Sequence, residues 1–171
     1  MKNVVTFLFL VSSYFLTAQN KATNFPEAFL GKYKGSLEIS TKKGNQTIPM
    51  EFHLTKTDKD SVFNYILVYN KSPRNYLLKI VDKEKGMYNI DENNGIILPA
   101  SYNKKVLHSF FEVQGNFLST RLAFNANQID FEILFSKLEN KVKTGGTSKD
   151  IPEVFGYPIA VFQKAILTKF N

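Results

Sequence analysis

The chain has 171 residues, with 22 Lys and Arg against 15 Asp and Glu, 16 Phe, 8 Tyr, and neither Cys nor Trp. This length is typical of one domain, and a hydrophobic share of 43% with a charged share of 22% excludes a fully disordered chain, a collagen and a coiled-coil rod. The absence of Cys excludes disulfides, thiol nucleophiles and Cys-ligated zinc.

The N-terminal segment 1–18 has the pattern of a secretory signal peptide. A basic start precedes the uncharged run Val4–Leu16, and Ala18 offers a small residue for cleavage. The run has 13 residues, whereas a membrane-spanning helix needs about 20. We therefore predict a cleaved signal, one mature domain over 19–171, and a secreted or periplasmic location without a lipobox cysteine. The junction at 15–20 resembles those of secreted proteins from Bacteroidetes-type bacteria.

The mature chain begins with one predicted helical turn and continues as strands. Within Asn24–Gly31, Pro26 stands near the first helical position and Gly31 provides the stop. Alternation of apolar and polar residues then predicts strands over 31–40, 46–55, 62–69, 76–80, 88–90, 96–101, 106–114, 118–124, 129–135 and 159–169.

The connections between these strands are short, apart from one. Gly115-Asn116 predicts a two-residue hairpin turn. The polar segment Lys137–Pro152, which contains Gly145-Gly146, predicts a long loop that could serve as a flap.

Short connections require antiparallel neighbours, because parallel strands need crossovers of a dozen or more residues. A sheet of about ten strands must also curl or close to bury its apolar face. We predict an all-β fold, an antiparallel up-and-down meander of about 8–10 strands closed into a barrel. A β-sandwich is the alternative.

Residues Phe29–Gly35 (FLGKYKG) resemble the first strand of the calycin barrels, the lipocalins and fatty-acid-binding proteins. Gly31 and Tyr33 stand where that family has the Gly and Trp of its Gly-x-Trp motif, with Tyr in place of Trp. Lipocalins also place an Arg over that Trp, and Arg121 is the candidate counterpart, although no motif aligns it. The resemblance implies a calycin-like barrel.

Aromatic and apolar side chains on the predicted inward faces suggest a small hydrophobic ligand inside the barrel. The candidate ligand-binding residues are Tyr33, Met50, Phe52, Tyr76, Tyr88, His108, Arg121 and Phe131. A core filled by the same side chains is the alternative. A cavity of roughly 300 Å³ or more with one or two buried polar groups would favour binding.

The sequence contains no motif for catalysis, a cofactor or a metal. His53 and His108 do not form a local ligand pair, and Asp91–Gly95 lacks the spacing of a calcium loop. The chain has no Gly-x-Ser-x-Gly nucleophile elbow and no P-loop. We therefore predict no enzymatic activity, no metal and no cofactor.

The positive charge is carried almost entirely by Lys, since Arg74 and Arg121 are the only arginines. Nucleic-acid sites favour Arg and cluster their charge, so we predict no nucleic-acid binding. Lysines spread over turns and strand edges protect those edges from pairing, and weak association with a membrane surface or anionic glycans stays open. Two other functions also stay open: a sandwich that binds glycans on exposed aromatics such as Tyr102 or Tyr157, and a small outer-membrane barrel.

Overall fold

The computed structural model describes residues 24–170, and the predicted signal peptide 1–18 lies outside them. The predicted N-terminal turn is confirmed as the 3-10 helix η1 (Glu27–Phe29). Within residues 24–170 no helix is long and apolar enough to cross a membrane. The barrel strands are β1 (Gly31–Thr41), β2 (Gly44–Lys56), β3 (Val62–Tyr69), β4 (Ser72–Asp82), β5 (Met87–Asp91), β6 (Ile97–Asn103), β7 (Val106–Val113), β8 (Asn116–Asn125), β9 (Gln128–Lys137) and β12 (Val161–Phe170).

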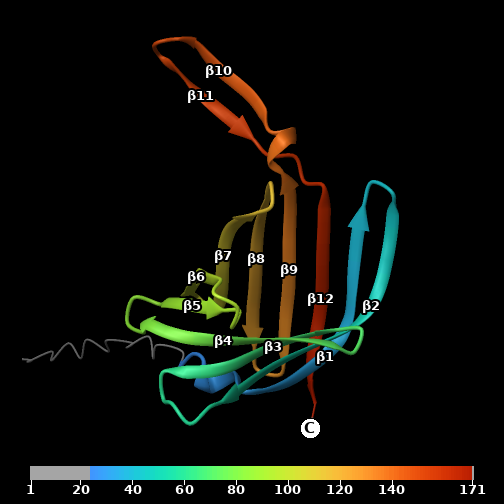
Figure 1. Ribbon diagram of the computed structural model, residues 1–171, viewed down its shortest axis with the longest axis vertical. Coiled ribbons are helices and arrows are strands. Elements are labelled where there is room, and N and C mark those ends of the chain that lie inside the picture. Colours follow the sequence, from blue (N-terminus) through green and yellow to red (C-terminus); the bar gives the residue numbers. More distant parts are fainter. Residues whose placement is uncertain (1–23, 171) are drawn as a thin grey trace, which may run out of the picture.

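These ten strands form one closed antiparallel barrel in the order β1-β12-β9-β8-β7-β6-β5-β4-β3-β2. Each strand pairs with the next barrel strand along the chain, and β12 closes the ring by pairing with both β9 and β1. The strands β7, β8, β9 and β12 run lengthwise in Figure 1, whereas β3 and β4 run across them. The predicted closed meander is thereby confirmed, and the β-sandwich alternative is excluded.

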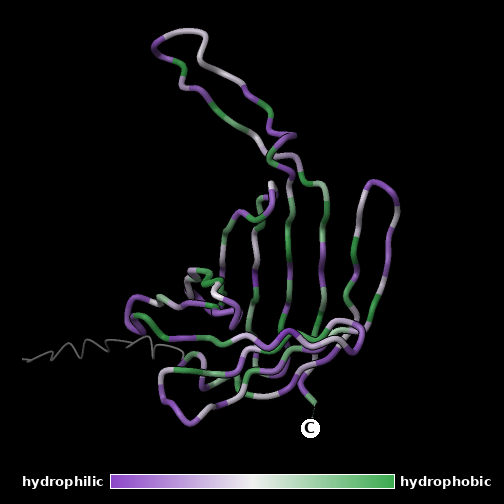
Figure 2. Tube along the Cα trace, in the orientation of Figure 1, coloured by the Kyte–Doolittle hydropathy of each residue, from purple (hydrophilic) through white to green (hydrophobic). Residues whose placement is uncertain are grey.

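The interior is apolar because side chains alternate between the two faces of each strand. On β9, Ile129 and Phe131 are 0% and 1% exposed, while the alternate residues Asp130 and Glu132 are half-buried on the outer face. Figure 2 shows the same alternation of hydrophobic and hydrophilic residues along neighbouring strands. Full burial of a large apolar side chain stabilises the fold by about 1.5–3 kcal/mol, so this pattern drives closure of the barrel.

The N-terminal turn closes one end of the barrel with aromatic rings. Phe25 is 1% exposed, and its ring stacks on that of Tyr102 at 4.0 Å between centroids and meets those of Tyr88 and Phe124 edge-on. The Tyr88 hydroxyl donates to the Phe25 carbonyl at 3.1 Å. Backbone polar groups of the turn are thus satisfied by tyrosines inside the barrel, as burial requires.

The prediction of a long loop over Lys137–Pro152 is wrong. The structure instead has the 3-10 helix η2 (Leu138–Asn140) and a two-stranded sheet of β10 (Val142–Ser148) and β11 (Ile151–Gly156). This hairpin projects away from the barrel in Figure 1, so it does not lie across the barrel as a flap. Every residue of both strands is exposed, and the apolar-polar alternation that reveals a strand arises only when one face is buried.

Candidate functional site

A chamber of about 120 Å³ lies inside the barrel, away from the end that η1 closes. Seven consecutive strands, β3 to β9, supply its walls. Most of the lining is apolar, and the residues involved are Tyr65, Leu67, Tyr69, Tyr76, Ile90, Glu92, Leu98, Ser109, Phe111, Thr120, Leu122, Phe131 and Ile133. The volume is below the roughly 300 Å³ of a pocket for a drug-sized ligand, so the chamber suits a small molecule or one part of a larger one.

Three tyrosines give the chamber a polar side. Tyr65 is 3% exposed and lies directly opposite Tyr76 across the β3–β4 pair. Burial raises the pKa of Tyr65 far above the ordinary value, and the neighbouring Tyr69 and Tyr76 raise it further. Burial likewise raises the pKa of Tyr69, with a further contribution from Tyr76. At neutral pH these hydroxyls therefore keep their protons and can donate hydrogen bonds to a ligand.

Two charged residues lie beside these tyrosines. Burial raises the pKa of Tyr76, and the Glu92 carboxylate raises it further through its charge and a hydrogen bond. Arg74 is close enough to lower the pKa of both Tyr69 and Tyr76. Glu92 lines the chamber, whereas Arg74 is exposed outside its lining.

The structure separates the predicted binding residues into two groups inside the barrel. Tyr76 and Phe131 line the chamber. The other four are packed into the core outside the chamber lining, with exposures of 0–2%: Tyr33, Met50, Phe52 and Tyr88. For those four residues the arrangement is that of a filled core, and Tyr33 uses its hydroxyl to hold the Phe29 carbonyl at 2.7 Å.

The prediction that His108 and Arg121 point into the barrel is wrong, because both lie on its outer face. Their chain neighbours Leu107 and Leu122 are each 1% exposed and point inward, and successive residues of a strand point to opposite faces. His108 and Arg121 are direct partners across the β7–β8 pair. Neither can reach a ligand in the chamber from that side.

The chamber also contains polar residues that the sequence reasoning missed. Tyr65 and Tyr69 lie in the segment Val62–Tyr69, which is apolar on both faces and therefore shows no inward pattern. Ser109 and Thr120 are inward-facing partners on β7 and β8. The register of β3 against the more clearly alternating β4 is the signal that would have assigned the two tyrosines.

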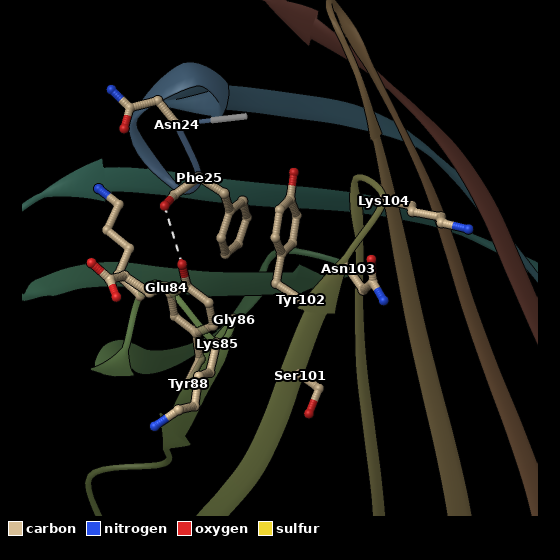
Figure 3. A pocket seen from close by; sticks show the side chains of 11 residues that line it. Asn24, Phe25, Glu84, Lys85, Gly86, Tyr88, Ser101, Tyr102, Asn103 and Lys104 are labelled. Atoms are coloured by element: carbon tan, nitrogen blue, oxygen red, sulfur yellow. Dashed lines mark hydrogen bonds between the residues drawn. The ribbon is translucent and has the colours of Figure 1, made fainter. Parts of the chain in front are cut away.

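A second hollow of about 450 Å³ lies at the end closed by η1. Figure 3 shows the Phe25 and Tyr102 rings side by side with the Tyr88 hydroxyl bonded to the Phe25 carbonyl, so these rings separate the hollow from the barrel interior. Two lysines of its rim already pair with carboxylates, Lys83 with Glu27 and Lys85 with Asp82. Two of the three described lysines that line the hollow are therefore already neutralised, so it offers little free positive charge to an anion.

Comparison with known proteins assigns neither a family nor a function to the chain. No protein-family model matches the chain, and no curated protein matches it. Within residues 24–170 no group of three or more His, Asp or Glu side chains is placed to hold a metal ion. The closed ten-strand antiparallel barrel is compatible with a calycin-like fold.

Proposed function

We propose that the protein is an exported, lipocalin-like binding protein that holds a small hydrophobic ligand in the chamber without catalysing a reaction. The observation that supports this most is an apolar chamber inside a closed barrel, with neutral tyrosine hydroxyls gathered on one side. Few polar groups on an apolar wall are what orient ligands in such pockets. Tyr76 and Phe131 are kept as binding residues, and Tyr65 and Tyr69 join them. Export rests on the sequence pattern of residues 1–18.

The outer face argues against a barrel embedded in lipid. A row of charged residues crosses the middle of four neighbouring strands. In the strand register Arg121 lies opposite Glu132, Glu132 opposite Lys164, and Lys164 opposite Glu38. In an outer-membrane barrel this band faces lipid, where one Arg or Lys at the midplane costs about 2–4 kcal/mol. The apolar interior and charged exterior fit a barrel surrounded by water.

Ligand binding is tested by native mass spectrometry and by thermal shift with a panel of short fatty acids, fatty alcohols, retinoids and haem. A ligand that binds only the folded protein raises Tm. Ile133→Trp places a larger side chain in the chamber, and we expect it to weaken binding about tenfold or more, or about 1.4 kcal/mol. Ile166→Trp is the matched control, because Ile166 is 54% exposed on β12. Absence of any bound ligand, or equal binding by both variants, would contradict the proposal.

A second candidate function is glycan binding on the outside of the barrel. The aromatic platform of Phe110, Phe117 and Tyr157 supports it: Phe110 is 61% exposed and lies nearly parallel to Phe117, with centroids 6.2 Å apart, and Tyr157 follows at 5.5 Å. Tyr102, the other aromatic considered, instead packs on Phe25. Glycan-array binding that is lost in Phe110→Ala would favour this function, and an array without signal would remove it.

A further inference from the structure

The barrel wall is incompletely paired at the seam between β6 and β7. Only three residue pairs join these strands, the last of them Ser101 with His108. Strand β6 starts four residues earlier, at Ile97, and β7 continues five residues beyond His108 to Val113. By contrast, β7 is paired with β8 along its whole length, from Val106 to Val113. The start of β6 and the end of β7 therefore do not pair with each other.

Pro99 explains why the seam opens. The Tyr102 N–H donates to the Gly86 carbonyl at 2.8 Å on the β5 side, so the alternate residues Ser101 and Pro99 direct their backbone groups toward β7. Proline has no N–H to donate, so the ladder cannot continue through this position. The Pro99 carbonyl instead accepts a hydrogen bond from the Ser109 hydroxyl at 2.6 Å.

The open part of the seam lies beside the chamber. A side cleft of about 250 Å³ lies there, lined by Glu92, Ile96, Leu98, Phe111, Glu112 and Val113. Three of these residues, Glu92, Leu98 and Phe111, also line the chamber. Side cleft and chamber are thus adjoining spaces that share one wall.

Among the described residues, the side cleft and the chamber are lined by acidic but by no basic side chains, and Arg74, beside Tyr69 and Tyr76, is exposed outside the lining. Glu92 and Glu112 put two carboxylates in the side cleft. A cleft lined by one sign of charge concentrates ligands of the opposite sign and disfavours those of the same sign.

We propose that the open seam between β6 and β7 is the portal to the chamber, and that Glu92 and Glu112 make it selective for neutral and cationic amphiphiles over anionic ones. The proposal rests on the proposed function, because a portal serves a chamber that binds. It deepens that function by naming the class of ligand, such as a fatty alcohol or amine in preference to the fatty acid of equal length.

The test uses a thiol reporter and needs no bound ligand. The chain has no Cys, so Thr120→Cys places its only thiol in the chamber wall. The reagents are methanethiosulfonates with a methyl, an aminoethyl or a sulfonatoethyl group, which are neutral, cationic and anionic. Val81→Cys is the control, since Val81 is 54% exposed on β4 and outside both spaces, and its rates correct for intrinsic reactivity and the net charge of the protein. Ile133→Cys is a second chamber reporter if Thr120→Cys does not fold.

After that correction we expect the anionic reagent to modify the chamber thiol about tenfold or more slowly than the cationic one. Glu92→Gln with Glu112→Gln should remove most of the difference. Ile96→Trp with Val113→Trp fills the cleft from residues outside the chamber lining and should slow all three reagents about tenfold. Because the chain has no Trp, a blue-shifted emission reports that the new indoles are buried.

If the chamber thiol is modified at equal rates with and without the two buried tryptophans, the open seam is not the portal. Equal corrected rates for cationic and anionic reagents would overturn the selectivity. A third outcome is a chamber thiol that reacts charge-selectively, and more slowly with the two tryptophans, in a protein that binds no member of the ligand panel. This outcome would support the portal and contradict the proposed function.

Discussion

Replacement of Phe25 by Ala should remove the seal at one end of the barrel. The ring is 1% exposed and contacts the rings of Tyr88, Tyr102 and Phe124 within 5.1 Å between centroids. Phe→Ala changes in cores cost about 3–5 kcal/mol. Each aromatic pair contributes about 0.5–1.5 kcal/mol beyond its buried area, which places this site toward the upper part of that range. At about 2–4 °C per kcal/mol for a domain of this size, Tm should fall by roughly 6–20 °C.

The assay is urea denaturation of the mature chain, followed by circular dichroism and repeated as a thermal scan. Phe110→Ala is the matched control, because the same ring is lost from a position that is 61% exposed. We expect the control to lower the free energy of unfolding by no more than about 1.5 kcal/mol, because it loses one aromatic pair, with Phe117, and little buried area. If Phe25→Ala costs no more than Phe110→Ala, the N-terminal turn does not seal the barrel and the account of its aromatic contacts is wrong.

Three further predictions concern the turns, the buried tyrosines and the hairpin. Gly86→Ala should lower the free energy of unfolding by about 1–3 kcal/mol more than Gly115→Ala in urea denaturation. Both glycines have positive φ, but only at Gly86 would a Cβ collide with the Tyr102 carbonyl, so equal losses would refute this reasoning. Burial raises the pKa of Tyr88 to about 12, so the folded state gains stability that is fully present below the unfolded pKa of about 10 and is lost as pH rises from 10 toward 12. Tyr88→Phe should therefore show a shallower fall of Tm at alkaline pH, and an unchanged profile would contradict the assignment. Replacement of residues 142–156 by a short Gly-Ser linker should leave the urea midpoint of the barrel nearly unchanged, because every residue of β10 and β11 is exposed, and loss of cooperative unfolding would show that the hairpin supports the barrel.

The chamber shows where sequence reasoning succeeds and where it stops. Phe131 lies on β9, whose regular alternation predicts the inward face correctly. On β7 the apolar residues Val106, Leu107, Phe110 and Phe111 fall on both faces, so the pattern cannot say which face is inward. The prediction of His108 as a binding residue requires its face to be the inner one. Pairing with β8 decides otherwise, and a shift of one residue exchanges every side chain between the two faces.

The amino-acid sequence by itself determined the all-β class and the antiparallel meander, because alternation and short turns are local properties of the chain. The tertiary structure decided that the meander closes into a barrel and does not form a sandwich. Only the tertiary structure decided that Tyr65 faces Tyr76, that Phe25 seals one end against Tyr88, and that the wall opens beside Pro99. The Tyr88–Phe25 contact joins residues 63 positions apart, and the opening depends on which neighbour the backbone of Pro99 faces. Such features follow from strand register and barrel closure, which set long-range contacts that no local pattern encodes.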